Sequence, residues 1–280
     1  MKVTVAIPFY NNEDTLEFAI KSVINQTYTD WLLLLINDGS TDSSMEIAKK
    51  YLSEKVKLID DGLNKGLIYR LNQAIDMTET PYFARMDSDD IMLPERLEKQ
   101  VNYLENHQDI DLVGSSAFII DECNNIVSVR RTSNKKSYNI SDLIKHGLFI
   151  HPTVVGKTEW FLKNKYNSYF NRAEDLELWC RTFQTMSYYK IEEPLLFYRD
   201  PLQIDLKKYE ATSKTNREII KKYVTGSERF KLLTREIFKI QSYKLLFKLN
   251  GLKIIYKRRN PSIDQLDLEY AKEKLLQAVK

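Results

Sequence analysis

Strand-like and helix-like segments alternate through the first hundred residues, and this alternation constrains the fold more than any other feature. Short apolar runs typical of buried strands lie at residues 4–9, 31–36, 56–59 and 82–84. The run at 31–36 has no polar alternation, as expected of a parallel strand covered on both faces. Between the runs, apolar residues recur at helical spacing, as in Leu16, Ile20, Val23 and Ile24. The pattern predicts an α/β fold with a mostly parallel sheet, right-handed crossovers and flanking helices.

The same alternation brings polar residues to one edge of the predicted sheet. Tyr10 follows the first strand, Asp38 the second, the loop at residues 61–64 the third, and Asp87 the fourth. Parallel strands end at a common edge, and open α/β sheets bind their ligands there. We therefore expect a binding site along this rim.

The chain beyond the first hundred residues is less regular. We expect a hairpin of strands at 112–120 and 126–130, a strand or extended segment at 149–155, a helix opening at Ala173-Glu174-Asp175 and a last strand at 195–198. Only helical periodicity remains beyond Pro201. This predicts an α/β domain over residues 1–201, with halves 1–110 and 111–201, and a helical extension over 202–280.

Three carboxylates in four residues follow the fourth strand, in the sequence Arg85-Met86-Asp87-Ser88-Asp89-Asp90. Crowding these charges is costly unless a cation or hydrogen-bond donors compensate them. Carboxylate oxygens suit Mg²⁺ or Mn²⁺, so a divalent metal site is one interpretation. The other is a solvated acidic turn that caps the next helix, which Pro94 is expected to start.

Targeting signals and cysteine pairs do not stand out in the sequence. The longest apolar runs, such as residues 32–36, are far shorter than the roughly 20 residues of a membrane-spanning helix, and the N-terminus lacks a signal-peptide layout. Cys123 and Cys180 lie far apart without metal-ligand spacing. We expect a cytoplasmic protein with two free thiols and no structural zinc site.

Charge is unevenly distributed, although the net charge is only +3. Residues 207–259 hold sixteen lysines and arginines but four glutamates, so an acidic body carries a basic C-terminal arm. Apolar residues in this arm recur at helical spacing, as in Phe230, Leu233, Ile237 and Ile240. Such helices can dock on the body, pair with a second copy of the chain, or make peripheral contact with the inner face of an anionic membrane. Nucleic acid is disfavoured, because the body is acidic and no nucleic-acid-binding motif occurs.

Six short motifs follow one another between residues 2 and 199. They are Ile7-Pro8-Phe9-Tyr10-Asn11, Asn37-Asp38-Gly39-Ser40-Thr41-Asp42, Asn64-x-Gly66-Leu67, Ala84-Arg85-Met86-Asp87-Ser88-Asp89-Asp90, His151-Pro152-Thr153 and Ala173-Glu174-Asp175. Together they resemble family 2 glycosyltransferases, most closely the bacterial branch that builds capsule, O-antigen and other surface glycans. The resemblance implies a GT-A fold, a nucleotide-sugar donor with UDP as the expected nucleotide, an Mn²⁺ or Mg²⁺ ion, inversion at the anomeric carbon, and a glycan, lipid-linked or protein-linked acceptor.

The resemblance also implies roles for the rim residues. Asp38 is expected to accept the imide N–H of uracil or thymine, and its alternative role is to cap the following helix. Pro8 and Tyr10 would form the surface on which the base lies, although Tyr10 fits an ordinary packing role equally well. The resemblance implies that Asn64 and Ser88 are further donor contacts. Asp87 is expected near the ribose and the water shell of the metal, Asp89 on the metal, and Asp90 at the cap of the next helix.

The general base of the family corresponds to Asp175. This residue lies in the first turn of a helix, where the dipole lowers the pKa, so burial or the neighbouring Glu174 must offset that effect. The alternative is that both carboxylates only complement the dipole. His151 is a candidate substrate contact or a structural histidine. Arg70 and Arg85 are candidate diphosphate partners or members of ion pairs.

The chain departs from the family after Tyr198-Arg199. Many relatives have a histidine shortly afterwards, whereas this chain continues Asp200-Pro201-Leu202-Gln203, which leaves the third protein ligand to the metal open, with Asp200 and Asp205 as substitutes. A sugar-1-phosphate nucleotidyltransferase is disfavoured because residues 1–30 contain no glycine for a phosphate loop. A degenerate nucleotide-sugar-binding scaffold is disfavoured by the intact Asp38, Asp87, Asp89 and Asp175.

Overall fold

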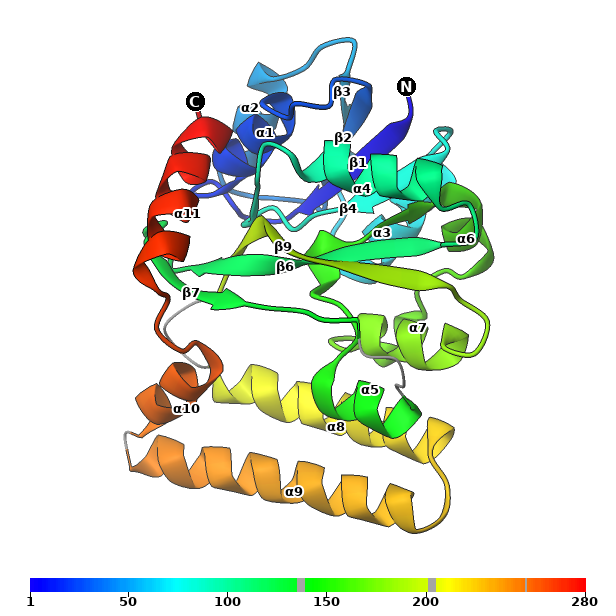
Figure 1. The fold of residues 1–280 in the computed structure, drawn as a ribbon, viewed down its shortest axis with the longest axis vertical. Helices are drawn as coiled ribbons and strands as arrows, with labels where there is room; N and C mark the ends of the chain where they lie inside the picture. Colours follow the sequence, from blue (N-terminus) through cyan, green and yellow to red (C-terminus); the bar gives the residue numbers. More distant parts are fainter. Residues whose placement is uncertain (135–138, 201–204, 250) are drawn as a thin grey trace.

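The computed structural model describes residues 1–134, 139–200, 205–249 and 251–280. Within these residues the strands form one nine-stranded sheet in the order β3-β2-β1-β4-β8-β6-β9-β5, with β7 paired to β6 (Figure 1). The strands are β1 (Val3–Phe9), β2 (Trp31–Asn37), β3 (Val56–Ile59), β4 (Tyr82–Arg85), β5 (Ile91–Met92), β6 (Leu112–Ile120), β7 (Ile126–Arg130), β8 (Val155–Lys157) and β9 (Tyr188–Arg199).

The first half of the sheet confirms the predicted parallel order. Strand β1 pairs in parallel with both β2 and β4, and β2 pairs in parallel with β3. Val5 and Ile7 of β1 pack in one apolar core, while Ala6 packs in a second core on the other face. Both faces are thus covered, which explains the unbroken apolar run in β2. The helices of this half are α1 (Leu16–Ile24), α2 (Ser44–Lys50), α3 (Leu67–Asp76) and α4 (Arg96–Asn106).

The second half of the sheet is mixed. Strand β8 is antiparallel to β4 and β6, whereas β9 runs parallel to β6 and antiparallel to β5. The segment expected to be extended at 149–155 is instead a 3₁₀ turn at His151–Thr153 followed by β8. Pro94 does not start the next helix as predicted, since it follows β5 and precedes the first residue of α4 by two residues.

Three further helices cover the second half of the sheet. They are α5 (Ile140–His146), α6 (Thr158–Lys163) and α7 (Glu174–Thr182), and a second 3₁₀ turn spans Ser168–Phe170. Helix α7 begins where the sequence predicts it. Helix α5 was not predicted, and its N-terminus is fixed by a capping box between Asn139 and Asp142.

The C-terminal helices are α8 (Leu206–Tyr223), α9 (Gly226–Lys248), α10 (Leu252–Arg259) and α11 (Gln265–Ala278). Helix α8 lies next to α5 (Figure 1). Ile220 of α8 and Val224 just past its end belong to an apolar cluster against which Ile140 and Ile144 of α5 pack. Helix α9 packs on the far side of α8, and α11 returns to the sheet, where it buries Ala271 and Ala278. The predicted boundary at 201 falls within residues 201–204, outside the described residues.

Two expectations about the whole chain can be compared with the structure. Within the described residues, no helix combines the length and the apolar character needed to cross a membrane. Cys123 is exposed, Cys180 is buried, and both are free thiols as predicted.

Candidate active site

A cavity of about 820 Å³ lies between the rim of the parallel half and the elements of the second half. Five predicted site residues line it: Arg85, Asp87, His151, Glu174 and Asp175. The other lining residues are Leu67, Arg130, Arg131, Thr132, Ser133, Asp142, His146, Gly147, Leu148, Phe149, Ile150, Pro152, Lys190 and Tyr198. The fold therefore brings residues from β4, from the 3₁₀ turn at 151–153 and from α7 into one space.

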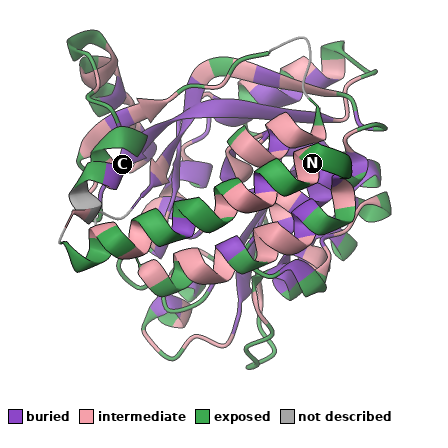
Figure 2. Ribbon diagram, turned by 90° about the horizontal axis from the view of Figure 1, so that it is seen from below, coloured by how far each residue is buried: buried purple, intermediate pink, exposed green. Residues whose placement is uncertain are grey.

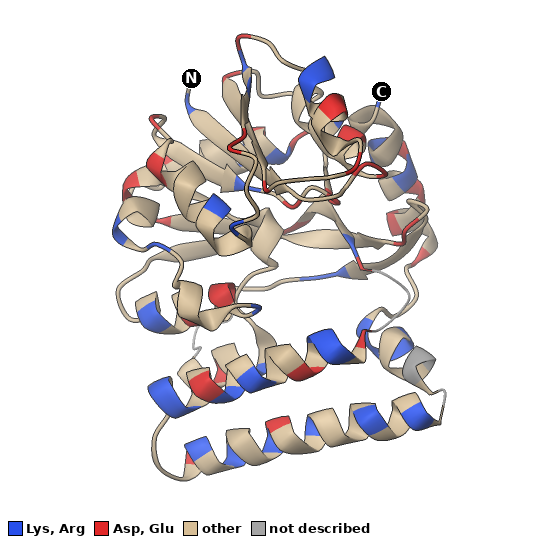
Figure 3. Ribbon diagram, turned by 180° about the vertical axis from the view of Figure 1, so that it is seen from behind, with Lys and Arg blue, Asp and Glu red and all other residues tan. Residues whose placement is uncertain are grey.

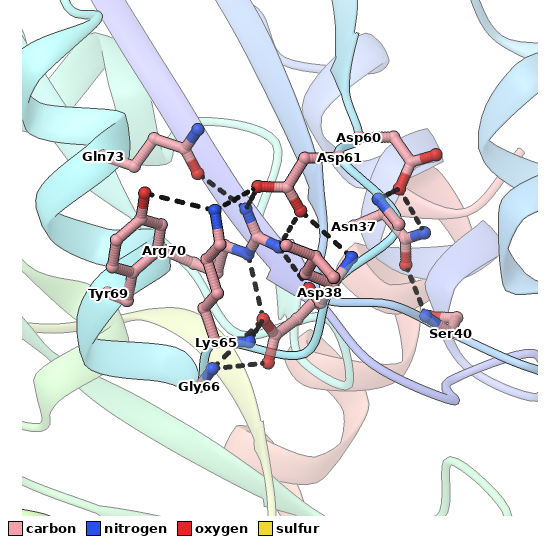
Figure 4. Close-up of polar contacts among 12 residues, drawn as sticks. Asn37, Asp38, Ser40, Asp60, Asp61, Lys65, Gly66, Tyr69, Arg70 and Gln73 are labelled. Carbon is pink, nitrogen blue, oxygen red and sulfur yellow. Dashed lines mark hydrogen bonds and ion pairs between the residues drawn. The ribbon is translucent and has the colours of Figure 1, made fainter.

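Asp38 lies just beyond β2 and organises the adjacent loop (Figure 4). Its Oδ1 accepts hydrogen bonds from the amide of Lys65 at 2.8 Å and from Nε of Arg70 at 2.9 Å, and its Oδ2 accepts from the amide of Gly66 at 3.0 Å. The carboxylate thus holds the start of α3, and the cap of α2 that the sequence suggested is not among its contacts. Gly66 has φ of 85°, which favours glycine at this turn.

Arg70 is fully buried and pairs with two carboxylates. Besides Asp38, its guanidinium donates to Asp61 at 2.6 and 3.1 Å, to Gln73 at 2.9 Å and to the carbonyl of Leu63 (Figure 4). Hydrogen bonds from Arg70 and then Lys65 hold the pKa of Asp61 well below its usual range. These contacts match the ion-pair alternative for Arg70.

The loop around Asn64 is held close to the turn after β2. A Cβ added at Gly39 would lie 2.9 Å from the amide nitrogen of Asn64, and Gly39 has φ of 75°. Only glycine permits this approach, so Gly39 places the exposed Asn64 beside Asp38.

Two other predicted donor-site residues, Pro8 and Tyr10, lie on or next to β1, and a third, Ser88, follows β4. Pro8 is buried within the strand, whereas Tyr10 beyond its end is 47% exposed and free to receive a flat ligand. The Oδ1 of Asn12 accepts hydrogen bonds from Ser88 Oγ at 2.8 Å and from the amide of Tyr10 at 3.2 Å. The segment after β1 is thereby tied to the segment after β4.

The acidic segment after β4 forms a compact cluster. One carboxylate oxygen from each of Asp87, Asp89 and Asp90 lies within 4.8 Å of the others. Burial and the charge of Asp87 raise the pKa of Asp89 to about 6, and burial and both neighbouring charges raise the pKa of Asp90 well above its usual range. A divalent cation would relieve this repulsion, so the oxygen-only donor set fits Mg²⁺ or Mn²⁺.

Asp90 does not cap α4, contrary to the prediction. Its Oδ1 accepts a hydrogen bond from the amide of Arg199 at 2.9 Å, and the N-cap position of α4 is held by Glu95, whose side chain makes no capping hydrogen bond. The buried Oδ2 of Asp90 has no hydrogen-bond partner among the described residues. Such an orphaned oxygen, within reach of two other carboxylates, is a further sign that the cluster is built for a cation.

Neither substitute for the third metal ligand joins this cluster. Asp200 instead bonds Arg130 and Arg259 at 3.2 Å each, and Asp205 caps α8 by accepting from the amides of Lys207 and Lys208. The third carboxylate of the cluster is Asp90 itself.

The carboxylate pair at the start of α7 faces the same cavity. Burial, followed by the charge of Asp175, raises the pKa of Glu174 to about 7. Burial also raises the pKa of Asp175, which offsets the helix dipole in the way that a base at this position requires. Arg85 lowers both pKa values, and it forms an ion pair with Asp87.

His151 combines a cavity position with structural contacts. Its Nε2 lies 2.8 Å from the hydroxyl of Tyr166, and its ring stands edge-on to Trp179. Burial, followed by the charge of Arg85, holds the pKa of His151 well below its usual range, so the ring is neutral at pH 7.

Several lining residues were not anticipated from the sequence. Arg130 is the last residue of β7, Arg131 follows it, and Lys190 is a buried lysine within β9. Arg199 donates from Nε to the carbonyl of Asp89 at 2.8 Å and so ties the end of β9 to the acidic cluster. The paired arginines were visible as a local charge, but a buried lysine inside a strand carries no sequence signal.

The fold belongs to the GT-A class of glycosyltransferase structures, as predicted. The chain superposes on the crystal structure of S. aureus TarS residues 1–349 in complex with UDP with a TM-score of 0.60, over 85% of this chain and 71% of that one. Their sequences are 17% identical, so this likeness concerns the fold alone.

The chain itself belongs to glycosyl transferase family 2, whose family model matches residues 4–170. The O-antigen biosynthesis glycosyltransferase WbnJ of Escherichia coli is 31% identical over 79% of this chain and 89% of its own length. The UDP-Glc:alpha-D-GlcNAc-diphosphoundecaprenol beta-1,3-glucosyltransferase WfgD of Escherichia coli is 30% identical over 63% of this chain and 68% of its own length. The family predicted from the six motifs is confirmed.

Proposed function

We propose that this protein is a metal-dependent, inverting glycosyltransferase that moves a sugar from a UDP-sugar to a hydroxyl group of a lipid-linked glycan during bacterial surface glycan synthesis. The observation that carries the proposal is that Asp87 of the acidic cluster and the carboxylate pair Glu174 and Asp175 line one cavity. The name of WbnJ supports the surface-glycan setting, and that of WfgD supports a UDP-sugar and a diphosphate-linked acceptor.

The donor half of the proposed site is the rim of the parallel sheet. Among the described residues, Asp38 Oδ2 accepts a hydrogen bond only from Gly66, so it keeps a lone pair for the imide N–H of uracil. Tyr10 and the backbone at Pro8 would form the surface on which the base lies, while Asn64 and Ser88 would contact the nucleotide. Arg70 would act by positioning Asp38 rather than by contacting the diphosphate.

Asp89 and Asp87 would hold the metal ion, with Asp90 beside them. A bound Mg²⁺ or Mn²⁺ would supply Lewis-acid neutralisation of the diphosphate as it departs. Arg85, which pairs with Asp87 inside the cavity, would orient that carboxylate.

The transfer step would use Asp175 as general base. As the acceptor oxygen bonds to the anomeric carbon, the bond from that carbon to the diphosphate oxygen breaks and its electron pair leaves with UDP. The hydroxyl proton passes to the carboxylate of Asp175. Attack from the face opposite the leaving group inverts the configuration, as in inverting glycosidases.

The exposed face of α9 supports contact with an anionic membrane. The apolar residues Phe230, Phe238 and Leu245 of this helix are 73%, 66% and 59% exposed. Exposed residues run along the helices seen from below in Figure 2. Lys231, Arg235 and Lys248 lie on the same helix, and basic residues are distributed along both α8 and α9 (Figure 3). An apolar face interspersed with cations fits a membrane interface better than bulk water. Helices α8 and α11 pack on the body of the protein, as the docking alternative expects. Helix α9 leaves this apolar face exposed, and we propose that it contacts the membrane that carries the acceptor.

A donor screen tests the proposed function. Purified protein with Mn²⁺ should be stabilised against heat by one nucleotide sugar, and the same compound should yield free nucleoside diphosphate when acceptor is added. Stabilisation without any release, across a panel of lipid-linked acceptors, would instead identify a nucleotide-sugar-binding scaffold.

A further inference from the structure

A second cavity, of about 350 Å³, lies among the C-terminal helices. Its lining comes from the end of β9 and from α8, α9 and α10, namely Tyr198, Lys208, Tyr209, Thr212, Ser213, Glu236, Lys239, Ile240, Tyr243 and Arg259. Tyr198 lines this cavity and the main cavity as well, so its side chain borders both spaces.

The lining of the second cavity is positively charged. Among the described residues, the lining contains Lys208, Lys239 and Arg259 but only one carboxylate, that of Glu236. Glu236 lies 3.6 Å from Lys239, and Arg259 pairs with Asp200 at 3.2 Å. Lys208 forms no ion pair with any residue that the structure describes. The cavity thus retains positive charge that an anionic ligand would neutralise.

The cavity also offers hydroxyl donors. Ser213 is 4% exposed, and its Oγ has no hydrogen-bond partner within the described chain. A buried hydroxyl without a partner is unfavourable unless a ligand or water satisfies it. The rings of Tyr209 and Tyr243 meet edge to face at 5.2 Å between centroids, which gives the cavity an aromatic wall.

We propose that this second cavity binds the diphosphate that joins the acceptor sugar to its lipid. The inference rests on the proposed function and names the part of the acceptor that this chain recognises. Cations and hydroxyl donors together select a phosphate group. The volume is at the lower end of the range of small-molecule sites, which suits a diphosphate with its first attached groups and not a whole nucleotide sugar.

The position of the cavity fits the same ligand. Tyr198 is common to both cavities, so a sugar attached to a diphosphate in the second cavity would project past this ring toward Asp175. Helix α9 forms one wall and carries the exposed apolar face on its outer side, where the lipid would remain in the membrane.

Calorimetric titration of the full-length protein with geranyl diphosphate, in Mg²⁺ and excess UDP, tests the proposal. The double variant Lys208→Gln/Lys239→Gln should weaken binding at least about tenfold, because two cations next to the diphosphate are lost. The control Lys214→Gln/Lys221→Gln removes the same charge from α8 outside the cavity and should stay within about twofold of wild type. Ser213→Ala should weaken binding without lowering the thermal midpoint, because it removes a hydroxyl that has no hydrogen-bond partner among the described residues.

Each contrary result overturns the proposal. Equal affinity in the two double variants, or undetectable binding by wild type, would exclude the cavity as the site. Equal affinity for inorganic diphosphate would identify a free-phosphate site, and equal affinity for uncharged geraniol would identify an apolar one. Release of nucleoside diphosphate is measured separately, so failure of this inference leaves the proposed transferase activity to be judged by its own assay.

Discussion

Replacing Arg70 by methionine should lower the free energy of unfolding substantially, although Arg70 does not line the main cavity. The guanidinium is fully buried and bonds Asp38, Asp61, Gln73 and the carbonyl of Leu63. Removing one partner of a buried ion pair costs about 3 to 5 kcal/mol. Asp61 is 32% exposed and can recover water, whereas Asp38 at 9% cannot. We therefore expect the lower end of that range, about 3 kcal/mol of unfolding free energy.

Urea unfolding at pH 7.5, followed by tryptophan fluorescence, measures this loss. Arg131→Met is the matched control, because Arg131 is 55% exposed and its ion pair with Asp267 should be worth less than about 1 kcal/mol. Adding Asp38→Asn to Arg70→Met should recover part of the loss, because it removes the charge left buried. A cost for Arg70→Met no greater than that for Arg131→Met would refute the assignment of Arg70 as the structural partner of Asp38.

Three other predictions concern single features. Asp89→Ala should abolish Mn²⁺-dependent binding of the donor. The thermal midpoint should not fall, because the substitution removes one of three carboxylates that repel one another. Undiminished metal-dependent affinity in calorimetry would contradict the metal assignment. Glu174 has a pKa of about 7 against an ordinary 4.5, so the folded state holds its proton more tightly and stability falls as pH rises from 4.5 to 7. Glu174→Gln should therefore be more stable than wild type by up to about 3 kcal/mol at pH 8, and equally stable at pH 4. Urea unfolding measures the difference in stability between the two proteins, and a difference that does not grow with pH would rule this out. Replacing Phe230, Phe238 and Leu245 by serine should abolish sedimentation with anionic vesicles at low salt, and wild-type binding that survives roughly 0.5 M salt or occurs equally on neutral vesicles would oppose the membrane proposal.

The parallel half of the fold could be predicted because its signals are local. Each apolar run marks a strand covered on both faces, and short connections leave one topology. Strand β9 was predicted only from residue 195, although it starts at Tyr188. Pro194 and buried Lys190 oppose a strand assignment, and the structure accommodates the proline where the pairing register with β6 shifts. Helix α5 was missed because only Leu143 in it is buried, so its apolar periodicity is weak.

The positions of the site residues could be predicted from the sequence, but their contacts could not. A motif places Asp38 and Asp175 at a strand end and a helix start, and the structure has them there. The partners of these residues depend on contacts across the chain. Asp38 meets an arginine 32 residues away, and Asp90 meets the amide of Arg199, 109 residues away. Spacing in the sequence carries no information about such pairs, so the roles of Arg70 and Asp90 became clear only from the packing.

Replacement of Asp175 by asparagine tests the central claim most directly. Asparagine keeps the size of the side chain but cannot take a proton, so nucleotide-sugar binding in Mn²⁺ should persist while the rate of transfer to acceptor falls at least about a hundredfold. The product formed by wild type should carry the configuration opposite to that of the donor, as determined by NMR of the new linkage. Transfer at a near-normal rate by the Asp175→Asn protein, or retention of the donor configuration, would contradict the account.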